Sequence, residues 1–152
     1  CIRDRYEHML ESIVALAAFI PVIIGMGGNI GTQSSTIIVR GMATGRIEVG
    51  SELLVLIKEL KVGLILGALY GILLGIFANL KFIGTDPMLG LVVGLSIASS
   101  MLIAVTVGSF TPLILRKLEI DPAVAAGPFV TTSIDILGVL LYFVIAGILL
   151  KI

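Results

Sequence analysis

Long apolar stretches free of Asp, Glu, Lys and Arg dominate the chain. They lie between Glu11 and Arg40, Lys61 and Lys81, Asp86 and Arg116, and Asp121 and Lys151, and only Asp135 interrupts the last of them. About 20 apolar residues in a helix cross the hydrocarbon core of a bilayer. The pattern therefore predicts an all-α integral membrane protein, a bundle of four transmembrane helices.

Helix starts are visible as two Asp-Pro pairs. Asp86-Pro87 precedes the third apolar stretch and Asp121-Pro122 precedes the fourth. An aspartate caps the free N–H groups of a helix start, and proline suits the first helical position. We expect the third and fourth spans to begin at these pairs. Before the second span, Ser51–Lys61 has apolar residues at helical spacing, which predicts an amphipathic segment along the membrane surface.

Composition and charge exclude several kinds of binding partner and site. The chain of 152 residues is 58% hydrophobic and 13% charged, with a net charge of zero, so no nucleic-acid partner is expected. Cys1 and His8 are the only cysteine and histidine, which excludes a disulfide framework and a Cys/His metal cluster within the chain. Because the chain begins with Cys1 rather than Met, we expect a fragment or a chain whose beginning is absent.

Lys and Arg residues favour one orientation in the membrane. With four spans, the loops after spans one and three face the same side, and the positive-inside rule makes that side cytoplasmic. These loops carry Arg40, Arg46, Lys58, Lys61, Arg116 and Lys117, against Arg3, Arg5, Lys81 and Lys151 on the other side. Both termini of this chain are then expected to face outward.

Glycines recur every four residues along the second span. They are Gly63, Gly67, Gly71 and Gly75. Small residues at this spacing let helix backbones approach closely in lipid, so we assign them to helix packing rather than to a permeation surface.

Asp135 lies near the centre of the last span, where a carboxylate costs about 2.5–3.5 kcal/mol on insertion scales. Thr131 and Thr132 precede it by one helical turn and share its face. Pro128 lacks a backbone N–H and frees a carbonyl one turn earlier. These oxygens indicate an ion site, although an aspartate satisfied by neighbouring hydroxyls would have the same sequence.

The segment GMGGNIGTQSST, Gly25–Thr36, lies inside the first span. Its glycines favour a broken helix, which membranes tolerate where the backbone lines a cavity. The alternative is a kinked helix packed through its glycines. If helix resumes, Asn29 and Gln33 lie one turn apart, with Thr32 beside them. The candidate pore-lining residues are thus Gly28, Asn29, Gly31, Thr32, Gln33, Pro128, Thr131 and Thr132, with Asp135 as the candidate metal ligand.

Oxygen ligands without nitrogen or sulfur favour hard cations, and Mg2+ keeps several of its waters and needs few protein ligands. A single carboxylate per chain provides only one negative charge for an ion that carries two positive charges. A homodimer with its twofold axis along the pore would bring two Asp135 side chains together.

Two segments together resemble a known family. FIPVIIGMGGNIGTQSSTIIVRGMATG, Phe19–Gly45, and DPAVAAGPFVTTSIDILG, Asp121–Gly138, are similar to the membrane domain of MgtE-type magnesium transporters. The resemblance implies a homodimeric Mg2+ channel of the bacterial or archaeal plasma membrane, with five membrane helices per protomer and a pore aspartate at Asp135. It also implies that Gly28, Asn29 and Gly31 line the pore and that Asp121 is a secondary acidic residue. The family's first helix and its cytosolic regulatory domains would then lie outside residues 1–152, which we expect to form one ion-permeation domain.

Two other functions fit parts of the pattern. An intramembrane aspartyl protease needs two carboxylates that share a proton, but Asp121 is about 20 Å from Asp135 by helix rise. A non-transporting assembly or anchor subunit would use the glycine ridge alone and would tolerate apolar replacements of Asn29 and Asp135. We expect no enzymatic activity.

Overall fold

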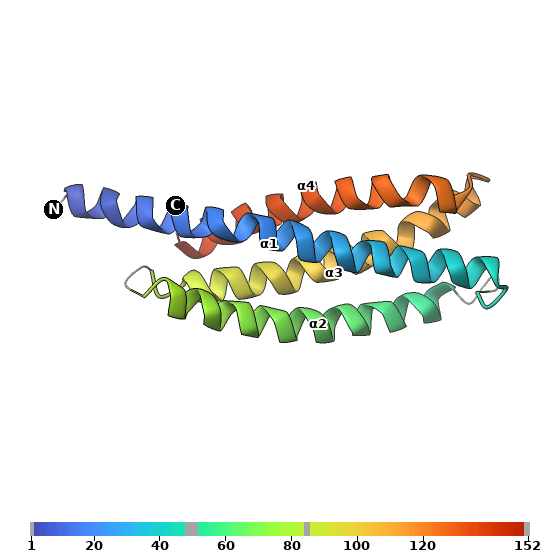
Figure 1. Cartoon of the computed structure of the whole chain (residues 1–152), viewed down its shortest axis with the longest axis horizontal. Coiled ribbons are helices and arrows are strands. Elements are labelled where there is room, and N and C mark those ends of the chain that lie inside the picture. The colour runs from blue at the N-terminus through green and yellow to red at the C-terminus, as the bar shows by residue number, and fades with distance from the viewer. Residues whose placement is uncertain (1, 48–51, 84–85, 151–152) are drawn as a thin grey trace.

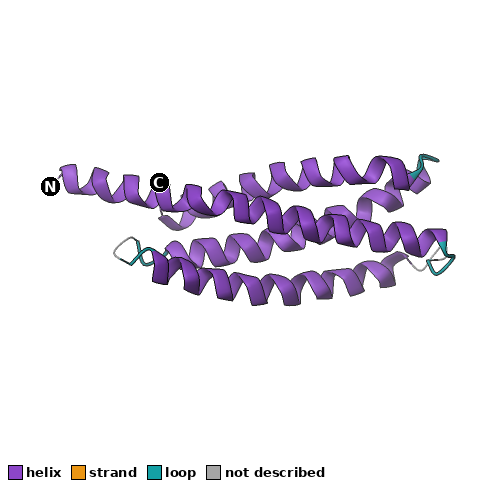
Figure 2. Cartoon of the chain, viewed as in Figure 1, coloured by secondary structure: helices purple, strands orange, loops and turns teal. Residues whose placement is uncertain are grey.

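The computed structural model describes residues 2–47, 52–83 and 86–150, and within these ranges it is entirely helical apart from short turns (Figures 1 and 2). The side chains of residues 2–13, 52 and 124–126 lie outside the description. The helices are α1 (Ile2–Ala43), α2 (Glu52–Lys81), α3 (Leu89–Lys117) and α4 (Pro122–Leu150).

Each helix contains a stretch long and apolar enough to cross a membrane: Val14–Ala43, Leu53–Lys81, Leu89–Lys117 and Gly127–Leu150. The prediction of an all-α membrane protein with four spans is therefore confirmed.

The helices form an elongated antiparallel bundle with α3 at its centre. α3 packs against α1, α2 and α4, and α1 also packs against α4. Figure 1 shows the α1–α2 and α3–α4 connections together at one end of the bundle. The two loops that we expect to be cytoplasmic thus lie on the same side. The main core contains Phe19, Ile23, Val93, Ile97 and Tyr142 from three of the helices.

Glycines bring α2 and α3 into backbone contact. Gly67, Gly71 and Gly75 are buried, and a Cβ added at Gly71 would lie 2.6 Å from the carbonyl oxygen of Gly94. A Cβ at Gly75 would lie 2.7 Å from the carbonyl oxygen of Gly90. Gly63 packs against the side chain of Val105 of α3, with a Cβ there 2.8 Å from Val105 Cγ2. The four-residue spacing therefore places the whole row against one neighbouring helix.

The two Asp-Pro pairs begin their helices differently. At Asp121, the carboxylate accepts a hydrogen bond from Ala123 N–H (2.9 Å) and α4 begins at Pro122, which confirms the prediction. Asp86 instead accepts from Met88 N–H (2.8 Å) within a turn, and α3 begins only at Leu89.

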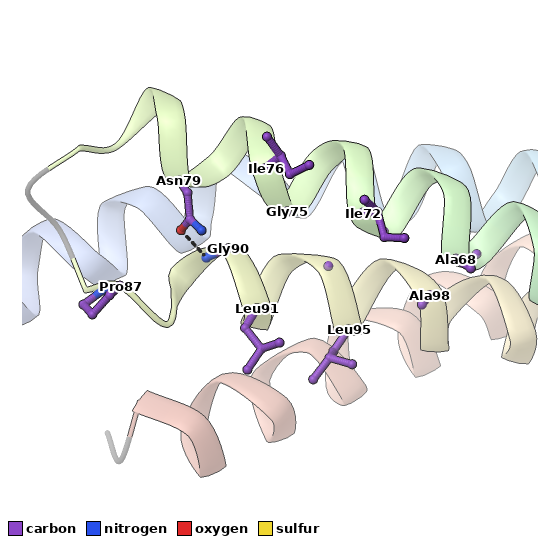
Figure 3. Close-up of a pocket in the computed structure, with 13 residues that line it drawn as sticks. Ala68, Ile72, Gly75, Ile76, Asn79, Pro87, Gly90, Leu91, Leu95 and Ala98 are labelled. Atoms are coloured by element: carbon purple, nitrogen blue, oxygen red, sulfur yellow. Dashed lines mark hydrogen bonds between the residues drawn. The ribbon is translucent and has the colours of Figure 1, made fainter.

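A residue from another helix caps α3. The side-chain oxygen of Asn79, near the end of α2, accepts a hydrogen bond from Gly90 N–H at 2.9 Å (Figure 3). Asn79 thus satisfies one of the free N–H groups at the start of α3. The predicted start at Asp86-Pro87 was wrong, because the helix begins two to three residues later, at Leu89.

The prediction of a break at Gly25–Thr36 is wrong, because α1 is one continuous helix from Ile2 to Ala43. In lipid, a broken helix leaves N–H and C=O groups without partners, which favours an unbroken one. Two of the four glycines, Gly27 and Gly31, serve close packing instead: a Cβ at Gly27 would lie 3.0 Å from Ile134 Cγ2 and 3.1 Å from Ser100 Oγ, and one at Gly31 would collide with Ile134. Of the alternative, a kinked helix packed through its glycines, the structure confirms the packing at Gly27 and Gly31.

The structure of the described part of Ser51–Lys61 also differs from the predicted surface segment. It forms the first turns of α2, which continues without interruption to Lys81. It is therefore part of the spanning helix rather than a separate surface segment, since a continuous helix keeps its backbone hydrogen bonds at the point where it meets the membrane.

Tyr142 joins α4 to α1. Its buried hydroxyl donates a hydrogen bond of 2.7 Å to the carbonyl oxygen of Leu16. We expect Tyr142→Phe to lower the free energy of unfolding by about 1 kcal/mol, because the buried acceptor loses its side-chain partner. Unfolding by SDS in mixed micelles, followed by circular dichroism, measures the change. Tyr70→Phe on the exposed side of α2 is the matched control, and an equal effect of both substitutions would contradict the prediction.

Candidate functional site

The candidate ion site lies where α1 crosses α4. A Cβ added at Gly28 would lie 3.9 Å from Oδ1 of Asp135, so the carboxylate lies beside a position of α1 that has no side chain. The structure thus brings together the two motifs that the sequence separates by about a hundred residues.

Asp135 is half-buried within the membrane-spanning part of α4. Among the described residues, no hydrogen bond or ion pair involves its carboxylate. A carboxylate at this depth is costly unless water, a cation or another polar group solvates it. The interpretation as an aspartate satisfied by neighbouring hydroxyls is therefore not supported: the Thr131 hydroxyl donates to the carbonyl oxygens of Gly127 (3.2 Å) and Pro128 (3.1 Å) instead.

Polar residues form an exposed stripe along α1. Asn29, Gln33, Thr36 and Arg40 follow one another at three- or four-residue intervals, and all four are exposed within the single chain. Each lies in Val14–Ala43, the part of α1 that is long and apolar enough to cross a membrane. Amide and hydroxyl groups facing hydrocarbon are unfavourable, so this stripe needs water or protein beside it.

Threonine hydroxyls add oxygen atoms next to the stripe. The hydroxyl of Thr32 donates to the carbonyl oxygens of Gly28 (2.8 Å) and Asn29 (3.0 Å), and that of Thr36 donates to the carbonyl oxygen of Thr32 (2.8 Å). Donating in this way occupies the proton and leaves the oxygen lone pairs available as acceptors. These groups can therefore bind a cation or its waters.

A cavity of about 350 Å³ lies between α1 and α4, from Thr32, one turn beyond Gly28, to Arg40. α1 forms one wall and the start of α4 forms the other. The lining residues are Thr32, Ser35, Thr36, Val39, Arg40, Pro122, Ala123 and Gly127. Six waters occupy roughly 180 Å³ at about 30 Å³ each, so a hydrated ion fits this volume.

Not every predicted lining residue reaches the polar surface. Gly31 is buried, and a Cβ there would collide with Ile134 and lie 3.1 Å from the carbonyl oxygen of Ala104. Gly31 thus packs α1 against α3 and α4, contrary to the expectation that it lines a pore. Pro128 and Thr132 are exposed on α4, and Asp121 is exposed at the start of that helix.

Ser100 is a buried residue that the sequence analysis did not single out. It is 2% exposed, and its hydroxyl lies between α1 and α4, 3.1 Å from a Cβ added at Gly27 and 3.0 Å from one added at Gly138. Its spacing of four from Ser96 is the signal in the sequence that indicates a small-residue packing face on α3.

The chemistry of the site suits a hydrated hard cation. Among the described residues, no three His, Cys, Asp or Glu side chains gather to form a dehydrated metal site. A single carboxylate surrounded by amide and hydroxyl oxygens can instead bind the waters of an ion such as Mg2+, which loses its hydration shell reluctantly.

Comparison with known proteins places this geometry in a family. The MgtE family, described as "Divalent cation transporter", matches residues 20–145. The magnesium transporter MgtE of Thermus thermophilus is 38% identical over 150 residues, which cover 99% of this chain and 33% of that protein. The MgtE of Bacillus subtilis is 37% identical over 141 residues, which cover 93% of this chain and 31% of that protein.

A third relative, the MgtE of Enterococcus faecalis, is 35% identical over 152 residues, which cover 97% of this chain and 32% of that protein. The chain therefore spans about a third of the length of these curated relatives. The matched residues include both the α1 stripe and Asp135, within four helices able to cross a membrane. This multi-pass membrane chain belongs to the MgtE family of divalent cation transporters, which are not enzymes.

Proposed function

We propose that residues 1–152 form an ion-permeation domain through which Mg2+ crosses the membrane along the surface shared by α1 and α4. The observation that carries this proposal is the polar stripe of α1 near the carboxylate of Asp135, which has no hydrogen-bond or ion-pair partner among the residues that the structure describes. Neither α2 nor α3 covers the stripe, although it lies within a membrane-spanning helix. A water-filled path explains both features, because it solvates the amides and the carboxylate together.

The path is completed by a second copy of the chain. Two Asp135 carboxylates facing one another across a twofold axis supply the two negative charges that a divalent ion needs. The exposed edge of the site, with Asn29, Gln33 and Thr132, supports this arrangement because it leaves the polar groups free to face a partner. Mg2+ is the transported substrate, and the magnesium transporters named above support this choice of ion.

Mg2+ passes as a hydrated ion. The amide oxygens of Asn29 and Gln33 and the hydroxyl oxygen of Thr32 accept hydrogen bonds from its waters. With the Arg40 end in the cytoplasm, an inside-negative potential favours inward flow by about 4.6 kcal/mol per 100 mV for two charges.

We expect the double substitution Asn29→Leu/Gln33→Leu to reduce Mg2+ flux roughly tenfold or more. Each lost hydrogen bond to a charged, hydrated ion is worth about 1.5–3 kcal/mol. Uptake into proteoliposomes that contain a Mg2+-sensitive dye measures the rate. Val14→Leu, at an exposed position of the same helix outside both the α1–α4 crossing and its cavity, is the control.

Labelling with a membrane-impermeant thiol reagent provides a second test. In a Cys1→Ser background, Gln33→Cys is expected to react and Ile72→Cys on the lipid side of α2 is expected to stay unmodified. Equal reactivity of the two positions, together with full flux in the double leucine variant, would instead favour a non-transporting assembly or anchor subunit.

A further inference from the structure

A second cavity, of about 510 Å³, lies at the end of the bundle where α1 connects to α2. Its walls come from the last turns of α1, the turn that follows them and the first turns of α2. The lining residues are Ile37, Arg40, Gly41, Thr44, Arg46, Ile47, Val55, Lys58 and Glu59. The cavity is distinct from the one between α1 and α4, although Arg40 lines both.

The turn that forms one wall is fixed in place. The carbonyl oxygen of Gly41 accepts hydrogen bonds from Arg46 N–H (2.9 Å) and Ile47 N–H (3.1 Å). Ile47 is 6% exposed and packs with Ile38 and Leu113, and a Cβ at Gly41 would collide with it. The absence of a side chain at Gly41 therefore lets the chain fold back and hold the Arg46 backbone beside α1.

The cavity carries an excess of positive charge. Among the described residues that line it, Arg40, Arg46 and Lys58 are basic and Glu59 is acidic. Within the described part of the chain, none of the three cations forms an ion pair. Their donors are therefore available for an anion, and guanidinium groups match the oxygens of a phosphate in geometry.

Apolar side chains beside the cavity indicate where the rest of the ligand lies. Ile37 of α1 and Val55 of α2 both line it, and Ile37 is 47% exposed. An anion that also places hydrocarbon against these residues is a phospholipid. The cavity lies at the end of the bundle that carries more basic residues, which the positive-inside rule places in the cytoplasm. The cytoplasmic leaflet of the membrane contains anionic lipids.

We propose that this cavity binds the phosphate head group of an anionic membrane phospholipid, with Arg40, Arg46 and Lys58 around the phosphate and the start of the acyl chains along Ile37 and Val55. Inorganic phosphate shares the charged part of this ligand, but it has no hydrocarbon to place against Ile37 and Val55.

Lipid binding at this cavity also regulates the ion path, and this part of the inference rests on the proposed function. Arg40 faces the cavity between α1 and α4 as well, where its positive charge opposes the passage of a divalent cation. A lipid phosphate beside Arg40 offsets that charge. Anionic lipid is therefore expected to increase Mg2+ flux.

Native mass spectrometry of the full chain, titrated with phosphatidylglycerol in detergent, tests the site directly. Arg46→Gln/Lys58→Gln is expected to weaken the tightest binding event roughly thirtyfold, because each basic residue near an anionic lipid contributes about 1 kcal/mol. Arg116→Gln/Lys117→Gln removes the same charge from the same end of the bundle, at exposed positions outside the cavity, and is expected to bind like the wild type.

Equal weakening in both pairs, or in neither, would overturn the site. A second arm adds millimolar inorganic phosphate, and displacement of phosphatidylglycerol by it would assign the cavity to a free anion and overturn the lipid. A third arm compares Mg2+ uptake in vesicles with and without phosphatidylglycerol. If the wild type takes up no Mg2+ in either vesicle but binds the lipid selectively, the proposed function fails and the lipid site stands.

Discussion

Asp135→Asn is expected to reduce Mg2+ uptake at least about a hundredfold while the chain stays folded. The attraction between a carboxylate and a divalent ion about 5 Å away, one water layer, is ~6 kcal/mol at an effective dielectric constant near 20. Even half of this attraction, after the cost of partly dehydrating the ion, corresponds to about a hundredfold. Uptake of Mg2+ into proteoliposomes, started by an inside-negative potential, measures the rate.

Two further variants make this experiment specific. Asp86→Asn removes a carboxylate at the α2–α3 turn and keeps an oxygen that can accept the Met88 N–H, so uptake is expected to be unchanged. Asp135→Glu keeps the charge and is expected to retain part of the flux. Full uptake by Asp135→Asn in a chain with wild-type helicity would exclude Asp135 as the ion ligand and leave the anchor subunit as the better interpretation.

The fold could be predicted wherever one local property decides the outcome. Span number depends on the length of uncharged apolar runs, and Gly63–Gly75 face a single neighbour because residues four apart share a helix face. Contacts between distant segments could not be predicted in the same way. Nothing near Pro87 in sequence indicates that Asn79 caps α3, or that Tyr142 bonds the Leu16 carbonyl.

The prediction of the candidate site failed in the same way where contacts between distant segments decide the outcome. It also contained one error that helical geometry could have prevented. Glycine preferences predict a break at Gly25–Thr36, but backbone hydrogen bonding in lipid keeps α1 continuous. In a continuous helix, Gly27 and Asn29 are about 200° apart around the axis. The glycines at 27 and 31 must then face one way and the amides at 29 and 33 the other. Helical geometry alone would have separated packing residues from lining residues, whereas the closeness of Gly28 to Asp135 required the structure.

Gly108→Ala is expected to have the largest effect on stability, because it acts where two backbones meet. A Cβ at Gly108 would collide with the carbonyl oxygen of Gly31 and lie 2.9 Å from its carbonyl carbon and 3.0 Å from its Cα. Main-chain atoms cannot rotate aside, so α1 must move away from α3. Overpacking of this kind costs about 1–3 kcal/mol. The free energy of unfolding in mixed SDS micelles, followed by circular dichroism, measures the loss.

Gly25→Ala is the matched control, since it makes the same chemical change in α1 where nothing lies within 4 Å of the added Cβ. Alanine favours a helix over glycine by up to about 1 kcal/mol, so this variant is expected to be as stable as the wild type or more stable. The difference between the two variants isolates the backbone contact from helix propensity. Equal stability of both would show that α1 and α3 do not approach this closely. Under the proposed function, the Gly108 variant also loses Mg2+ flux, because α1 carries Gly28 and the polar stripe past Asp135 and moves as one helix.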